Sequence, residues 1–326
     1  MASTLEAIHV SNSALPIIDI GGLSSSSLTE RKAVAERLRA ACLDNGFFYI
    51  VNHGVPAQII TSLFDETRRL FDSPAAVKST VDKSLSFCQR GFEPMRAQTL
   101  EAGSPPDLKE SFYIGPELPL DDPRVVARRF NHGPNLWPVG MGSFRPVTEA
   151  YFSTMLDLSR ALMRGLALAL HLDEEYFAAY CTNPHATLRL LHYPPQPANA
   201  APGEKGAGAH SDFGGITLLL QDEVGGLQVR GKTKSEWIHA TPIAGTFVVN
   251  LGDLIARWTN DRFRSTVHRV VNASGRERYS VPFFFSGNPD QVVECLPSCL
   301  ESGEAPKYPR TTVEGHLREM YRRTYK

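Results

Sequence analysis

The spacing of hydrophobic residues in the first half of the chain is typical of helices. Hydrophobic positions recur every three or four residues, as on one face of an α-helix. The first predicted helix ends at Asn45-Gly46, where glycine permits a left-handed turn, and the second ends before Pro74, which cannot continue a helix. The predicted helices cover residues 29–45, 59–73 and 145–172. Short runs of β-branched and aromatic residues predict strands at 15–20 and 47–51.

The pattern changes near residue 187 to short β-prone runs separated by turn residues. Strands at this density are typical of a β-sandwich or a closed barrel. Gly225-Gly226 is predicted to form a hairpin turn with positive φ angles. A final amphipathic helix is predicted from Thr312 onward. The predicted strands cover residues 187–192, 216–221, 227–230, 237–241, 246–251, 265–271 and 278–285.

Residues 78–146 lack a clear period and are rich in proline, glycine and charged residues. A single strand is predicted there, at 111–114. Residues 199–209 are predicted to form a flexible loop before the next strand. Long ordered loops of compact domains usually carry function, so we expect part of a binding site in the first of these segments.

Charge and cysteine content narrow the function. The chain has 34 Lys and Arg against 35 Asp and Glu, so neither nucleic acid nor an anionic membrane is expected as a partner, and a small-molecule substrate is. No apolar run approaches the roughly 20 residues that cross a bilayer, and residues 1–10 lack a secretory pattern, so a cytoplasmic location is expected. Five scattered cysteines predict unpaired thiols, not a zinc cluster.

Three residues could bind a metal ion. In the extended segment His210-Ser-Asp212, the two outer side chains point to the same side. A His-x-Asp pair alone is weak evidence, because such an aspartate is more often a turn or cap residue. His268, on a predicted strand far along the chain, could return to the same rim. Two histidines and one carboxylate form the facial triad of non-haem Fe(II) oxygenases, which leaves metal positions open for substrate and O₂.

The pair Arg278-Tyr-Ser280 is suited to bind a carboxylate. Both side chains share one face of a predicted strand, and a guanidinium beside a hydroxyl makes charge-assisted hydrogen bonds to an anion. The alternative is a surface ion pair within the charged segment 276–278. The apolar run 281–285 that follows favours a strand entering the core, where an arginine needs an anion.

With these residues, the chain resembles the isopenicillin N synthase-like branch of the Fe(II)/2-oxoglutarate-dependent dioxygenases over nearly its full length. The resemblance implies a mainly β fold with supporting helices: a distorted double-stranded β-helix, or jelly roll. It also implies an N-terminal α/β region over 1–145 and the oxygenase core over 146–326, forming one compact unit. The matching segments are Leu15-Pro-Ile-Ile-Asp-Ile20, 46–56, 250–254, 258–261, His210-x-Asp212, His268 and Arg278-x-Ser280.

The resemblance further implies the cofactors and the reaction. Fe(II) would be held by His210, Asp212 and His268, and 2-oxoglutarate by Arg278, Ser280 and Tyr193. Many plant members carry asparagine two residues before this tyrosine, whereas this chain has Leu191. With O₂, such an enzyme oxidises a C–H bond of a small organic molecule, by hydroxylation, desaturation, ring formation or ring expansion, and releases succinate and CO₂. Secondary metabolites and nucleobase-like compounds are the expected substrates.

Other candidate residues have a purely structural alternative beside the functional one. Tyr113, Phe213 and Phe284 match positions that often line the substrate pocket of relatives, but core packing is an equal alternative for each. His53 is expected to be a turn residue, and Asp253 a turn former. The remaining histidines are expected to be surface or hydrogen-bonded core residues: His132, His171, His185, His239 and His316.

Two other functions remain open. One is an oxidase of the same fold that does not use 2-oxoglutarate, since isopenicillin N synthase and aminocyclopropane-carboxylate oxidase also carry Arg-x-Ser. The synthase group has a glutamine near its C-terminus, whereas this chain ends Arg322-Arg-Thr-Tyr-Lys326, which disfavours that reading. The other is a non-catalytic, cupin-like metal-binding module, for which an incomplete cosubstrate site would be expected.

Overall fold

A computed structural model describes residues 15–324 except 198, 232 and 234. Its centre is an eight-stranded sheet in which β1 and β2 are parallel and the other neighbours are antiparallel. The strand order is β1 (Ile17–Asp19), β2 (Phe47–Val51), β10 (Phe247–Leu251), β7 (Ile216–Gln221), β12 (Arg278–Gly287), β5 (His185–Tyr193), β4 (Glu110–Ile114) and β3 (Gly91–Glu93).

A second sheet faces the large one, and the site lies between them. Its order is β6 (Ala207–His210), β11 (His268–Val270), β8 (Leu227–Arg230) and β9 (Trp237–His239), all antiparallel. A separate pair joins β13 (Val292–Val293) to β14 (Thr311–Thr312).

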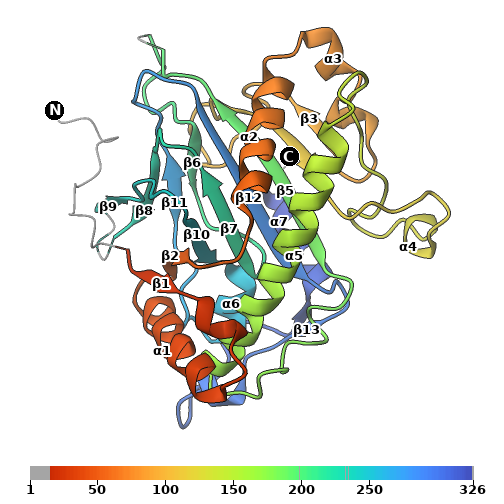
Figure 1. The fold of residues 1–326 in the computed structure, drawn as a ribbon. Coiled ribbons are helices and arrows are strands. Elements are labelled where there is room, and N and C mark those ends of the chain that lie inside the picture. Colours follow the sequence, from red (N-terminus) through yellow and green to blue (C-terminus); the bar gives the residue numbers. More distant parts are fainter. Residues whose placement is uncertain (1–14, 198, 232, 234, 325–326) are drawn as a thin grey trace.

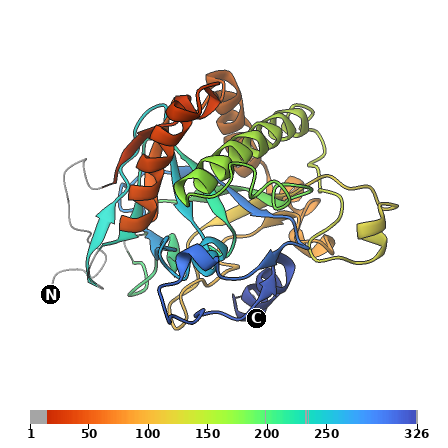
Figure 2. The same ribbon diagram turned by 90° about the horizontal axis from the view of Figure 1, so that it is seen from below.

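Three helices cover the outer face of the large sheet (Figure 1). They are α1 (Leu28–Asp44), α2 (Ala57–Phe71) and α5 (Phe144–Ala169), and both α2 and α5 contact β12. The C-terminal helix α7 (Val313–Thr324) lies on the opposite side of that sheet, as the view from below shows (Figure 2). The remaining short helices are η1 (Gly21–Ser24), α3 (Ala75–Ser79), η2 (Lys83–Leu85), α4 (Pro123–Val126), α6 (Asp253–Trp258) and η3 (Pro297–Cys299).

The large sheet is buried on both faces, which explains its nearly continuous apolar strands. On β12, Val281, Phe283 and Phe285 pack into the core on the helix side. On β2, Phe47 and Tyr49 instead belong to the smaller cluster between the sheets. Because side chains alternate along a strand, the even-numbered residues of β12 from Arg278 to Ser286 face the second sheet. This face of β12 carries polar residues, and these line the candidate functional site.

Glycine is required where α1 meets β2. Gly46 has φ +77°, and a Cβ atom there would lie 2.0 Å from the backbone oxygen of Arg264. At the other end of α1, the Ser27 side chain accepts a hydrogen bond from the backbone N–H of Glu30, which caps the helix. The predicted boundaries of this helix are thus close to those observed.

The structure corrects three local predictions. Gly225 and Gly226 do have positive φ angles, +81° and +105°, but they do not form a hairpin, because β7 and β8 belong to different sheets. Residues 78–146 hold more than one strand, since β3 pairs with β4 and the short helices η2 and α4 also lie there. Asp253 is not a turn residue but the first residue of α6.

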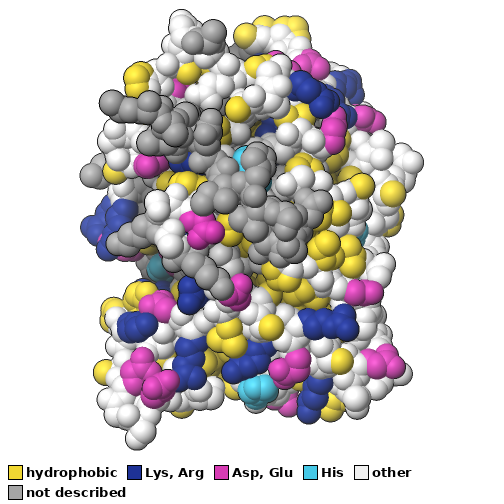
Figure 3. Space-filling view, turned by 90° about the vertical axis from the view of Figure 1, so that its left-hand side faces the viewer, with side chains coloured by type: hydrophobic (Ala, Val, Ile, Leu, Met, Phe, Trp, Pro, Cys, Tyr) yellow, Lys and Arg dark blue, Asp and Glu magenta, His cyan; other side chains and the backbone are white. Residues whose placement is uncertain are grey.

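Four further features bear on the predictions from the sequence. Strands β1–β4 of the predicted N-terminal region join the same sheet as β5, β7, β10 and β12, and the boundary near residue 145 stays a prediction. None of the described helices is long and apolar enough to span a bilayer. All five cysteines are free thiols. On the face seen in Figure 3, acidic and basic side chains are interspersed around the grey residues.

Candidate active site

Two small cavities meet between the sheets. The Arg278 cavity, of about 60 Å³, includes Tyr193, Arg278 and Ser280 in its lining. The Gln98 cavity, of about 80 Å³, includes Gln98 and His185. The residues that line both cavities are Leu100, Arg189, His210, Asp212 and Phe284. A molecule in either cavity would therefore border His210 and Asp212, and one in the Arg278 cavity would also border His268.

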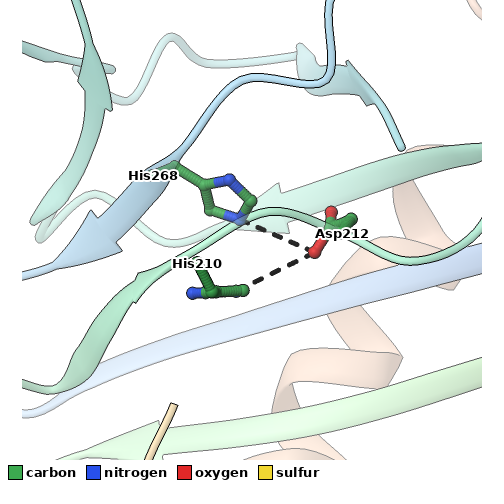
Figure 4. Close-up of side chains that lie close together, drawn as sticks. All are labelled: His210, Asp212 and His268. Atoms are coloured by element: carbon green, nitrogen blue, oxygen red, sulfur yellow. Dashed lines mark ion pairs between the residues drawn. The ribbon is translucent and has the colours of Figure 1, made fainter. Parts of the chain in front are cut away.

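That group is brought together by strand pairing. His210 ends β6 and lies directly opposite His268 on β11, while Asp212 follows in the loop after β6. The Asp212 Oδ1 atom is 3.8 Å from His210 Nε2 and 3.7 Å from His268 Nε2 (Figure 4). One nitrogen or oxygen atom from each side chain lies within 4.8 Å of the others. The three side chains therefore lie close together, as the sequence predicts.

Backbone carbonyls orient both imidazole rings. His210 Nδ1 is 2.8 Å from the Gly208 carbonyl oxygen, and His268 Nδ1 is 3.1 Å from that of Thr266. A carbonyl only accepts, so Nδ1 carries a proton in each ring, and in the neutral form of the ring Nε2 holds the lone pair. Burial lowers the pKa of His210, and the neighbouring His268 lowers it further, which keeps the His210 ring neutral. Such a donor pair suits a metal ion.

The Asp212 carboxylate is also fixed by its neighbours. Its Oδ2 atom accepts hydrogen bonds from Thr217 Oγ1 at 2.6 Å and Asn250 Nδ2 at 2.7 Å, while Oδ1 points toward the histidines. Burial alone would raise the pKa of Asp212, but His268, His210 and these two hydrogen bonds hold it below its usual value. The carboxylate is thus charged and presents one oxygen to the centre of the group.

The segment Asn250-Leu-Gly-Asp253 holds the Asp212 loop in place. Asn250 binds the Asp212 side chain, and the backbone N–H of Asp253 donates to the Asp212 carbonyl at 2.8 Å. Gly252 permits this approach, because a Cβ atom there would lie 2.3 Å from the Gly214 carbonyl oxygen. Sequence reasoning matched this segment to the resemblance but missed its supporting role.

Arg278 is completely buried in the wall of its cavity. Its guanidinium donates to Ser280 Oγ at 3.2 Å and to Gln221 Oε1 at 3.4 Å, and lies 4.8 Å from the ring centre of Tyr193. Its Nε atom has no hydrogen-bond partner among the described residues, and no described carboxylate lies within ion-pair distance. A buried arginine without an acidic partner is costly unless an anion binds it.

A buried ion pair beside this cavity was missed by sequence reasoning. Lys109 lines the Arg278 cavity and pairs with Asp107. Asp107 Oδ1 also accepts from the backbone N–H of Gly208, two residues before His210, at 2.8 Å. Burial lowers the pKa of Lys109 to about 8 despite the attraction of Asp107. The pair ties the loop before β4 to the strand that carries His210.

Tyr113, Phe213 and Phe284, the predicted substrate contacts, all line the Gln98 cavity. Tyr113 also donates its hydroxyl hydrogen to Glu93 Oε2 at 2.8 Å. Sequence reasoning missed the other side chains in this lining, because they come from segments without a recognisable motif. Those missed are Gln98, Leu100, Thr187, Arg189, Ser286, Leu317 and Tyr321.

His185 requires a correction. We expected a surface residue or a hydrogen-bonded core residue, but His185 is buried in the lining of the Gln98 cavity. Neither ring nitrogen has a hydrogen-bond partner among the described residues. The prediction was wrong because it rested on the lack of a partner nearby in the sequence. The pairing of His185 with Gly287 on β12 carries it to the cavity.

Comparisons with known proteins define the family. Residues 15–140 match the N-terminal family described as non-haem dioxygenase in morphine synthesis, and residues 184–287 match the 2OG-Fe(II) oxygenase superfamily. The chain is 43% identical over 316 residues to the 2-oxoglutarate-Fe(II) type oxidoreductase hxnY of Emericella nidulans, covering 96% of this chain and 90% of that one. It is 39% identical to the dioxygenase citB of Monascus ruber, covering 95% of each chain.

Solved structures agree with this family. The crystal structure of a full-length Neurospora crassa protein in complex with alpha-KG superposes with a TM-score of 0.84 at 30% identity, covering 98% of this chain and 99% of that one. The same Neurospora crassa protein with alpha-KG and thymine gives 0.83 at 30% identity, with the same coverage.

The fold is therefore a jelly-roll core flanked by helices. The chain belongs to the 2OG-Fe(II) oxygenase superfamily. It is a 2-oxoglutarate-dependent dioxygenase that uses Fe(II), 2-oxoglutarate and O₂ to oxidise a C–H bond of a small organic molecule, with release of succinate and CO₂.

Proposed function

We propose that the two cavities divide the reaction between cosubstrate and substrate. His210, Asp212 and His268 hold Fe(II), the Arg278 cavity holds 2-oxoglutarate, and the Gln98 cavity holds the molecule that is oxidised. The observation that carries this proposal is Arg278, which is fully buried with no described carboxylate within ion-pair distance, beside three potential metal-ligand atoms. An anion in the Arg278 cavity would supply the missing charge.

The residues present fit this metal. Both histidines offer Nε2 and Asp212 offers Oδ1, and none of these atoms makes a hydrogen bond to a described residue. Two imidazoles and one carboxylate leave open positions on Fe(II), as non-haem oxygenases require. When bound, the iron and 2-oxoglutarate together activate O₂, which is the chemistry that this cofactor pair supplies.

The side chains then have distinct tasks. Arg278 and Ser280 bind the far carboxylate of 2-oxoglutarate by charge-assisted hydrogen bonds, and Tyr193 packs against the guanidinium. Leu191 is buried in the apolar cluster between the sheets, so it adds packing where many plant members have an amide. Thr217 and Asn250 keep Asp212 charged and oriented. Tyr113, Phe213 and Phe284 line the cavity for the substrate and exclude water from it.

We further propose a nucleobase-like or secondary-metabolite substrate. The chain superposes on the Neurospora crassa protein that has been solved with thymine, and it is 36% identical to the clavatol oxidase claD of Penicillium crustosum. Five free thiols fit a reducing compartment, so a cytoplasmic location is part of the proposal. The mixed surface charge seen in Figure 3 gives no support for a nucleic-acid partner.

Anaerobic spectroscopy tests the proposal. Fe(II) and 2-oxoglutarate added to the protein should give a visible charge-transfer band, and adding a substrate with O₂ should release CO₂ from 2-oxoglutarate. An oxidase that does not use 2-oxoglutarate would turn over without this release. A non-catalytic metal-binding module would bind iron but show no turnover. Either result would contradict the proposed roles of Arg278 and Ser280.

A further inference from the structure

The far wall of the Gln98 cavity presents an amide group that the protein does not use. Gln98 is 5% exposed, and its Oε1 atom accepts a hydrogen bond from Arg189 Nη2 at 2.9 Å. A guanidinium can only donate, so this bond fixes which end of the amide is oxygen. The Nε2 end is buried and has no hydrogen-bond partner among the described residues. Gln98 therefore offers two N–H donors in the lining of the cavity.

His185 offers a second unused polar group in the same lining. It is 6% exposed, and both ring nitrogens are buried without a partner among the described residues. Burial, together with Arg90 and His132, lowers its pKa to about 3, so the ring is neutral. A neutral imidazole has one donor and one acceptor. The ring stacks on Phe130, with 13° between the planes, which fixes its position.

The charged side chain in this part of the cavity lining, Arg189, already has hydrogen-bond and ion-pair partners. Arg189 donates to Glu93 Oε2 at 3.0 Å and to Ser111 Oγ at 2.8 Å. Tyr113 also donates to Glu93. The wall thus offers hydrogen bonds without an uncompensated cation among its described lining residues, in contrast to the Arg278 cavity. Buried polar groups without partners are rare in proteins, and a ligand in the cavity would complete the hydrogen bonds of these two.

From these contacts we infer that the substrate is a small uncharged ring of the lactam type, anchored by Gln98 and His185. Its carbonyl oxygen accepts from Gln98 Nε2, and its ring N–H donates to His185. The ring packs against Leu100, Phe213 and Phe284. The cavity measures about 80 Å³ and shares His210 and Asp212 with the Arg278 cavity. This inference rests on the proposed function, because it places the ring beside the proposed iron ligands.

Three probes of similar shape test the class of ligand. They are 4-methyl-2-pyridone as the lactam, toluene as the hydrocarbon and 4-methylbenzoate as the anion. Binding is measured by anaerobic calorimetry on the full chain loaded with Fe(II) and 2-oxoglutarate. We expect the pyridone to bind at least about 10-fold more tightly than either other probe, because only it satisfies both polar groups. Equal or tighter binding of toluene or 4-methylbenzoate would overturn the inference.

Two variants test whether Gln98 and His185 bind the ligand. Gln98→Glu keeps an oxygen for Arg189 but replaces the N–H donors, and His185→Phe keeps a ring against Phe130 without its nitrogens. Each should weaken pyridone binding by about 10-fold and leave toluene binding unchanged. The matched control is Gln58→Glu, a change at an exposed glutamine of α2, which should alter neither. Pyridone affinity that survives both cavity variants would contradict the assigned anchors.

The visible band of the Fe(II) and 2-oxoglutarate complex, recorded before each probe is added, separates the two claims. A normal band with no preference for the pyridone contradicts the substrate class alone. A missing band in the wild-type protein contradicts the proposed cofactor roles. In that case the probe affinities of the metal-free protein still decide the inference, because Gln98 and His185 are part of the fold.

Discussion

The two cavities that meet at His210 and Asp212 are built in different ways. The polar residues of the Arg278 cavity lie on neighbouring strands: Tyr193 on β5 is paired with Arg278 on β12, and Ser280 lies two residues further along. The Gln98 cavity draws on the loop before β4, on β4, β5 and β12, on the loop after β6 and on α7. In the division proposed above, one end of β12 would bind the cosubstrate and the other end would border the organic substrate.

This difference indicates which cavity can change its ligand specificity with little effect on the stability of the core. The Arg278 cavity shares its strands with the core, so its geometry is fixed by the sheet. Loops and a terminal helix can be altered with less effect on the core than strands, and they carry most variable contacts in proteins. Predictions that perturb one cavity and spare the other test this division.

The largest effect is expected from the metal ligands. His210→Ala, Asp212→Ala or His268→Ala should abolish turnover while the protein stays folded, because these side chains border the cavities and not the main core. Loss of an outer partner of a ligand typically costs about 10–100-fold in metal affinity, and loss of the ligand itself should cost more. Iron content and succinate formation measure the effect. Activity that survives in any one variant would contradict the assignment of that residue.

A smaller effect, confined to the cosubstrate, is expected from Arg278→Leu. Removing one partner of a buried charged pair costs roughly 2–5 kcal/mol, which corresponds to about 30-fold or more in the apparent affinity for 2-oxoglutarate. Iron binding should survive. As a control, 2-oxopentanoate lacks the far carboxylate and should lose much less affinity in the variant. Wild-type affinity for 2-oxoglutarate in the variant would contradict the assignment of Arg278 as the residue that binds its far carboxylate.

The residues of the two cavities also differ in how well they could be predicted from the sequence. That His210 lies near Asp212, and Arg278 near Ser280, could be predicted because residues two apart in an extended segment share a face, which is visible in the sequence. The main helices and most strands could also be predicted, because their hydrophobic periods are long or regular.

The Gln98 cavity could not be predicted in the same way. Gln98 lies in a segment without a period, and Leu317 and Tyr321 reach the cavity only because α7 packs there. The Gly225-Gly226 hairpin failed for a related reason. The turn chemistry is local, whereas the pairing of β7 with β10 and β12 depends on distant residues. His185 was dismissed because its neighbours in space are far away in the sequence.

A moderate effect on iron is expected from Asn250→Ala. This change removes the 2.7 Å hydrogen bond to Asp212 Oδ2 and leaves the bond from Thr217. The carboxylate is then less firmly oriented, so iron affinity should fall by about 10-fold or more, within the range seen for outer partners of metal ligands. An Fe(II) titration with a competing chelator measures it. An unchanged iron affinity would show that Thr217 alone orients Asp212.

The smallest effect should come from Leu317→Ala on α7. The side chain borders the Gln98 cavity but not the Arg278 cavity. Losing this apolar contact should lower kcat/KM for the organic substrate by about 10-fold, as small changes in a hydrophobic pocket do, with no change in 2-oxoglutarate affinity. Steady-state kinetics with each compound varied in turn measure both values. An equal loss for both compounds would contradict the division between the cavities.

The most direct test of the account is a crystal structure of the protein with Fe(II) and 2-oxoglutarate grown without O₂. We predict iron bonded to His210 Nε2, Asp212 Oδ1 and His268 Nε2, with the far carboxylate of 2-oxoglutarate on Arg278 and Ser280 and the Gln98 cavity left for the substrate. Binding of that carboxylate by Lys109 or Arg189, or 2-oxoglutarate lying in the Gln98 cavity, would contradict it.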